Sequence, residues 1–387
     1  RKRPALRGIT FRLQPTFTLA RAARVCSLSG RVIAFVRKKT STSDMKSPRP
    51  LATLVALLLG CAPLFGADSY YFLKEIPVGG DGGWDYLSVD SGARRLYVSH
   101  ATKVIVIDLD KNAVVGEIAD TPGVHGLAVA SDLKRGFSTN GRENKVSVVD
   151  LETLKTLSKV DTGANPDGML YEPAAQEVYA FNGRGQSATV IDARAGTVVA
   201  TVALAGKPEF AAADSKAGRV YDNLEDKSEV VAIDTKTHTV VSRWPIAPGE
   251  EASGMAFDAA HHRLFLGCGN KLMVMMDSTS GKVVASVPIG DGVDANAFDP
   301  ASQLAFASCG GDGTVTIAHE DSPDKLTVVQ VLQTTRGART MTIDPKTHRI
   351  YLGAASYLAP AAGAKSGRPQ MVPGSFKILV YGTEPSA

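Results

Sequence analysis

The sequence predicts an all-β fold, a seven-bladed β-propeller of four-stranded antiparallel blades, from three repeated features. β-Branched residues dominate short apolar runs, and no convincing ten-residue helical period appears. A run of the type RLYVSH, at 95–100, occurs seven times. With spacings of 42, 42, 42 and 43 residues, apolar runs end at Asp108, Asp150, Asp192, Asp234 and Asp277. Short antiparallel strands repeated at this interval are typical of propeller blades.

Each repeat supplies its strands in a fixed order. The first strand ends in an acid or turn residue, as in YLSVD at 86–90, and the RLYVSH-type run is the second. The third ends in aspartate, and the fourth is a run such as VVGEI at 114–118. The last repeat ends with the run at 377–381, so we expect YYFLKEIPV at 70–78 to complete the last blade. Such closure removes exposed sheet edges.

The first 67 residues are expected to lie outside this fold. Residues 1–44 carry eleven Lys and Arg against one acid, and we interpret them as disordered, non-native upstream translation. Residues 45–67 have the charged, apolar and small-residue order of a secretory signal. The end of its apolar run also resembles a bacterial lipobox at Cys61, so lipidation there and ordinary cleavage near Ala67 are both open. We therefore expect a periplasmic or extracellular protein, tied to a membrane only if Cys61 carries lipid.

The remaining residues, 68–387, are expected to form one propeller with a Pro/Gly/Ala-rich loop at 355–375. They carry 30 basic and 38 acidic residues, a net charge of −8. Nucleic acid is therefore not an expected partner, because phosphate contacts need clustered Lys and Arg. We expect a monomer.

The repeated runs also carry a family resemblance. RLYVSH and RGFSTN resemble the Tyr-Val-Thr-Asn core of the YVTN-repeat β-propellers, and the chain resembles the YncE-like group across 70–382. Longer stretches such as GRENKVSVVDLETLK strengthen the likeness. WD-repeat proteins fit less well, because their Trp-Asp ends a third strand whereas Trp84-Asp85 begins a first strand. The resemblance implies an exported seven-bladed propeller and no established catalytic set.

One polar position in each repeat is the candidate ligand site. It lies five residues before the end of each first strand and holds Asp85, His125, Asp167, Glu209, Ser253, Asp294 and Arg339. If these residues open the innermost strands, they ring one mouth of the central channel. Carboxylates and imidazole suit a divalent cation, for which the candidate ligands are Asp85, His125, Asp167 and Glu209. Polar residues also belong in a water-filled channel without a ligand, with Arg339 neutralising a carboxylate.

Other candidates have structural interpretations. Cys268 and Cys309 occupy equivalent positions in adjacent repeats and are expected to be buried free thiols rather than a disulfide. His261, His262 and His348 are expected in solvated turns between first and second strands. The recurrent tyrosines are expected to pack between blades, namely Tyr97, Tyr179, Tyr221 and Tyr351.

Two functions remain open from the sequence. The chain lacks hydrolase-elbow, Walker, zincin and Cys-x-x-Cys motifs, and we assign no catalytic residue. This favours an exported, non-catalytic binding or scaffold propeller with an unknown protein, peptide or glycan ligand and no predicted cofactor. The alternative is a metal-assisted, lactonase-like hydrolase that uses the acidic channel mouth and a divalent metal.

Overall fold

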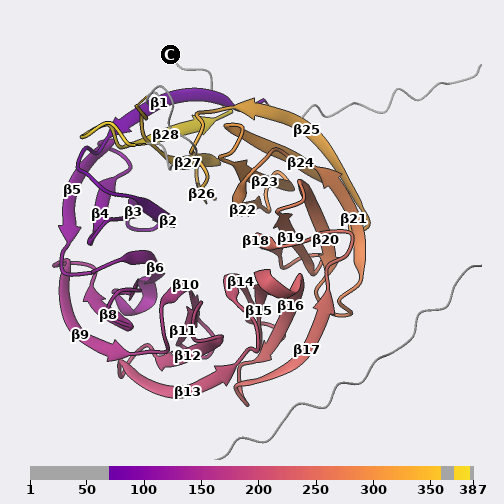
Figure 1. Cartoon of the computed structure of the whole chain (residues 1–387), viewed down its shortest axis with the longest axis horizontal. Coiled ribbons are helices and arrows are strands. Elements are labelled where there is room, and N and C mark those ends of the chain that lie inside the picture. The colour runs from indigo at the N-terminus through magenta and orange to yellow at the C-terminus, as the bar shows by residue number, and fades with distance from the viewer. Residues whose placement is uncertain (1–68, 359–369, 384–387) are drawn as a thin grey trace, which may run out of the picture. The chain divides into compact units, whose positions relative to one another are not determined.

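The computed structural model describes residues 69–358 and 370–383, and our interpretations of residues 1–67 concern sequence outside this part. Seven four-stranded antiparallel sheets form a ring (Figure 1). The predicted seven-bladed β-propeller is therefore confirmed. We number the blades 1–7 in the chain order of their innermost strands.

Each blade contributes one strand to each of four positions, counted outward from the axis. The innermost strands are β2 (Trp84–Asp90), β6 (Val124–Ala130), β10 (Pro166–Glu172), β14 (Pro208–Asp214), β18 (Ala252–Asp258), β22 (Val293–Asp299) and β26 (Met341–Asp344). The second strands are β3 (Arg95–His100), β7 (Arg135–Asn140), β11 (Glu177–Asn182), β15 (Arg219–Leu224), β19 (Arg263–Cys268), β23 (Leu304–Cys309) and β27 (Arg349–Ala354).

The outer two positions complete the blades. The third strands are β4 (Lys103–Asp108), β8 (Lys145–Asp150), β12 (Ser187–Asp192), β16 (Glu229–Asp234), β20 (Leu272–Asp277), β24 (Thr314–Ser322) and β28 (Lys377–Gly382). The outermost strands are β5 (Ala113–Ile118), β9 (Lys155–Asp161), β13 (Thr197–Ala203), β17 (Thr239–Pro245), β21 (Val283–Pro288), β25 (Lys325–Gln333) and β1 (Tyr71–Pro77). Two short 3-10 turns, η1 (Ser131–Leu133) and η2 (Glu225–Lys227), are the helical elements of the described residues, and neither could cross a membrane.

The N-terminal strand closes the ring as predicted. β1 pairs antiparallel with β28, with Ile76 opposite Ile378, in a sheet of order β1-β28-β27-β26. Just before β1, the buried Tyr70 donates its hydroxyl proton to the carbonyl oxygen of His348 at 2.7 Å. The beginning and end of the described chain are thus held in one blade (Figure 1).

The core lies between neighbouring blades. Second and third strands are buried on both faces, whereas the outermost strands expose alternate side chains, as in the pattern of β5. The four recurrent tyrosines are each at most 3% exposed, which confirms their predicted packing between blades. Cys268 and Cys309 are buried free thiols, also as predicted.

Candidate functional site

The predicted site positions lie where the innermost strands depart from regular pairing. In blade 1, Trp84 is opposite His100 and the next pair is Leu87 with Val98, so Asp85 lies inside the irregularity. Five further blades show the same shift at the start of the inner strand, in β6, β10, β14, β18 and β22. Irregularities of this kind redirect side chains. In blade 7 the candidate Arg339 precedes β26 instead of opening it.

Hydroxyl groups of the second strands form hydrogen bonds with backbone groups of the inner strands at the irregular positions. The backbone N–H of Asp85 donates to Ser99 Oγ at 3.1 Å, and Ser99 Oγ donates to the carbonyl of Tyr86 at 3.1 Å. Thr139 Oγ1 in blade 2 donates to the carbonyl of Asp167 in blade 3 at 2.7 Å. The polar residues of the RLYVSH-type runs therefore position the site residues.

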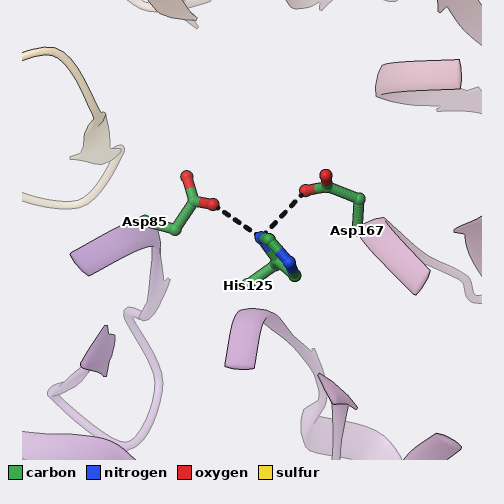
Figure 2. A group of neighbouring side chains, drawn as sticks. All are labelled: Asp85, His125 and Asp167. Carbon is green, nitrogen blue, oxygen red and sulfur yellow. Dashed lines mark hydrogen bonds and ion pairs between the residues drawn. The ribbon is translucent and has the colours of Figure 1, made fainter. Parts of the chain in front are cut away.

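Three of the seven candidates form a compact group. The Oδ2 atom of Asp85 lies 2.9 Å from Nδ1 of His125, and Oδ1 of Asp167 lies 3.3 Å from the same nitrogen. Figure 2 shows both carboxylates pointing toward the imidazole, each from a different blade. One ligand atom from each residue lies within 4.8 Å of the other two, and all three side chains remain partly exposed. This group can hold a metal ion.

The other four candidates have different partners. Arg339 Nε lies 2.8 Å from Asp294 Oδ2, and Arg339 Nη2 lies 3.8 Å from Asp85 Oδ1, so this guanidinium lies beside two carboxylates. Glu209 pairs with Lys207 at 3.2 Å and does not belong to the three-residue group. Ser253 is buried and donates to the carbonyl of Val293 at 3.4 Å.

The titratable groups of the site have raised pKa values. Burial, reinforced by neighbouring carboxylates, raises the pKa of Asp167 and of Asp294 to about 6 and that of Glu209 to about 8. Burial opposes protonation of His125, but its hydrogen bond with Asp85 and the charges of Asp167 and Asp85 outweigh this, and its pKa is raised. The acidic neighbours thus favour the cationic form of His125, whereas the three carboxyl shifts arise mainly from burial.

Tyr86, which the repeat comparison did not single out, crosses the ring beside this site. Its hydroxyl donates to the carbonyl of Glu209 in blade 4 at 3.2 Å, and its ring lies 5.1 Å from that of Phe210. Gly168 permits this arrangement, because a Cβ there would lie 2.1 Å from the same Glu209 carbonyl oxygen. Tyr86 therefore joins blade 1 to blade 4 without an intervening blade.

Asp222 is a second residue that the sequence reasoning missed. It lies in β15, is 0% exposed, and neither carboxylate oxygen has a hydrogen-bond partner among the described residues. Burial, then the charge of Glu209, raises its pKa well above the ordinary value. Aligning the second strands would have found it, because the equivalent residues carry no charge: Val98, Ser138, Ala180, Leu266, Ala307 and Leu352.

The described ends of the 355–375 insertion lie near Arg339. Tyr357 forms an isolated antiparallel bridge with Met371. A Cβ added to Gly337 would lie 2.9 Å from the Tyr357 ring, two residues before Arg339. Residues 359–369 lie outside the described part.

Comparison with solved structures supports the architecture. The fold is similar to a chain of the Kuenenia stuttgartiensis hydrazine synthase, with a TM-score of 0.62 and 18% identity over 71% of this chain and 94% of that one. It is also similar to U3-55K, with a TM-score of 0.67 and 11% identity over 80% and 98% of the two chains. At these identities the likeness shows the fold alone. No protein-family model and no curated protein matches the sequence.

Proposed function

We propose that the protein is an exported, YVTN-type binding propeller that holds a divalent cation at Asp85, His125 and Asp167. Loops on the same face then bind a protein, peptide or glycan ligand. The observation that carries this proposal is the convergence of three ligand atoms from three successive blades. Carboxylate oxygen and imidazole nitrogen together suit a borderline cation such as Zn²⁺.

The surrounding charges support a cation rather than an anion. Asp294 and Glu209 add carboxylates beside the group, and each already has one basic partner, Arg339 or Lys207. The two carboxylates that face His125 share a single imidazole. A bound divalent ion would replace the imidazole proton and neutralise both carboxylates.

Metal-assisted hydrolysis is the second candidate function, and one observation favours it. Burial and the charge of Asp167 raise the pKa of Glu209 to about 8, although its partner Lys207 favours the ionised form. A protonated carboxyl near a metal site can act as a general acid, and a metal there would supply polarisation of a substrate carbonyl. Binding remains the primary proposal because the three converging ligand atoms support it directly.

The first experiment removes one ligand. The full-length protein and its Asp167→Asn variant are stripped with chelator, dialysed against Zn²⁺ and analysed for metal by elemental mass spectrometry. We expect the variant to hold one zinc fewer per chain, because its amide oxygen lacks the carboxylate charge. Asp161→Asn serves as the control, since Asp161 is 87% exposed at the surface.

We call the proposed cation site at Asp85, His125 and Asp167 the axial site. Equal zinc content in the wild type and Asp167→Asn would refute it. Loss of zinc in Asp167→Asn but not in Asp161→Asn would support it. Zinc-dependent hydrolysis of a lactone panel, absent in Glu209→Gln while zinc is retained, would favour the enzymatic alternative over simple binding.

A further inference from the structure

The innermost strands begin near the candidate site, and their other ends carry a second set of carboxylates. Asp258 ends β18 in blade 5 and accepts backbone N–H groups from Ala260 at 2.9 Å and His261 at 3.2 Å. The same turn-capping role belongs to Asp214 and Asp299 in the neighbouring blades 4 and 6. These carboxylates are therefore part of the fold in the first instance.

We call the boundary between two neighbouring blades a seam. At three seams, a basic side chain of the next blade pairs with such a carboxylate. Between blades 4 and 5, His262 Nδ1 lies 3.5 Å from Asp214, and between blades 6 and 7 His348 Nδ1 lies 2.8 Å from Asp299. The histidines are thus in the predicted turns but also contact the preceding blade. Between blades 7 and 1, Arg94 lies 2.5 Å from Asp344. Each pair balances one buried carboxylate with one basic side chain.

The seam between blades 5 and 6 has no pair of this kind among the described residues. Gln303 occupies the turn position held by His262 and His348 elsewhere, so the next blade offers no histidine to Asp258. Blade 6 instead contributes a carboxylate, Glu320, near the end of β24. Uncharged residues follow the third strands at the equivalent position in blades 1–5, namely Leu109, Leu151, Ala193, Thr235 and Ser278.

Glu320 is a buried carboxylate that has His261 as a basic neighbour but forms no hydrogen bond with the described residues. Its side chain is 0% exposed. The nearby guanidinium of Arg263 contacts other acceptors, Asp277 at 2.5 Å and the carbonyl of Pro323 at 2.5 Å. A buried ionised carboxylate is costly unless it is paired, protonated or bound to a metal.

The side chain of Glu320 points at a histidine that it shares with Asp258. Nδ1 of His261 lies 3.2 Å from Glu320 Oε1 and 2.7 Å from Asp258 Oδ2. One ligand atom of each residue lies within 4.8 Å of the other two. Burial, then the charge of Asp258, raises the pKa of Glu320 to about 7. The partly exposed His261 gives access from solvent.

We propose that Asp258, His261 and Glu320 form a second divalent-metal site, best suited to Zn²⁺, that bridges blades 5 and 6. Two carboxylate oxygens and one imidazole nitrogen are ordinary zinc ligands, and water can complete the coordination. The ion joins inner strand β18 of one blade to third strand β24 of the next. It therefore stabilises the folded ring by binding the native state.

The test isolates this site from the axial one. In the full-length Asp85→Asn/Asp167→Asn protein, stripped with chelator, we expect zinc titration to show one equivalent bound per chain and a rise in Tm. Adding Glu320→Gln should abolish both effects. Because this change removes a buried charge, we expect the metal-free triple variant to fold, which circular dichroism checks.

His348→Gln is the matched control, since the Asp299–His348 pair has no third ligand within reach among the described residues. In the same double-variant background it should retain the zinc equivalent. Two results would overturn the seam site formed by Asp258, His261 and Glu320. One is that the double variant binds no zinc at saturating concentration, and the other is that it still binds one zinc per chain after Glu320→Gln. Failure of the axial site gives a different result, in which the wild type binds only the one zinc that Glu320→Gln removes.

Discussion

The two ends of the innermost strands differ in how their polar residues are used. At one end, carboxylates in six of the seven blades close the strand, at Asp90, Glu172, Asp214, Asp258, Asp299 and Asp344. Backbone N–H groups of the following turns donate to them. At the other end the residue type changes from blade to blade, from Asp85 to His125 to Ser253. The uniform end builds the fold, whereas the varied end leaves its side chains available to a ligand.

Removing a carboxylate at the uniform end should have the largest effect. Asp299 is 0% exposed and accepts from Ala301 N–H at 3.2 Å, Ser302 Oγ at 2.6 Å and His348 Nδ1 at 2.8 Å. Asp299→Ala leaves these donors without their acceptor. We expect a loss of about 3 kcal/mol in the free energy of unfolding, measured by urea denaturation.

Asp294→Ala, at the varied end of the same strand, is the matched comparison. Its carboxylate pairs with Arg339, but burial and the charges of Asp85 and Asp167 oppose its ionisation. These effects partly cancel, so we expect the free energy of unfolding to change by less than about 1 kcal/mol. Equal losses in the two variants would contradict the division between a structural and a ligand-accessible end.

Asp222 should make stability depend on pH. Below pH about 4 both the folded and unfolded states hold its proton, and above that pH only the unfolded state ionises. Because the folded-state pKa is raised, the stabilisation is fully present at low pH and is lost as the pH rises. From pH 5 to pH 8, we expect the free energy of unfolding to fall more steeply in the wild type than in Asp222→Asn.

Urea denaturation at the two pH values measures this difference. Asp161→Asn is the control, because Asp161 is an exposed carboxylate at the end of β9. It should retain the wild-type pH dependence. If Asp222→Asn also retains it, the buried carboxyl does not hold its proton in the folded state.

The repeats contain enough information for the fold and for part of the site. Seven copies with a constant spacing predict the blades, and the unpaired run at 70–78 predicts the closing strand, because both depend on local pattern. The column of inner-strand residues also brings Asp85, His125 and Asp167 to one region. The fold predictions succeed because equivalent positions in the blades have equivalent surroundings.

Residues that break the repeat were harder to interpret. Glu209 has the expected position, but it forms an ion pair with Lys207. Comparing equivalent positions of the repeats does not reveal this pair. Tyr86 contacts Glu209 across the ring, a relation between blades 1 and 4 that neither period nor spacing contains. Asp222 and Glu320 were visible as charged residues at otherwise uncharged positions, but their burial and lack of partners required the structure.

Tyr86 allows the smallest and most specific test of the varied end. Tyr86→Phe removes the 3.2 Å hydrogen bond to Glu209 but keeps the ring beside Phe210, so we expect a loss of about 1 kcal/mol in the free energy of unfolding. Tyr70→Phe, which removes a 2.7 Å hydrogen bond in the closing blade, should cost a similar amount. Zinc binding should be unchanged in both variants, because neither hydroxyl belongs to a metal group. Zinc loss in Tyr86→Phe alone would instead make this phenol part of the axial site.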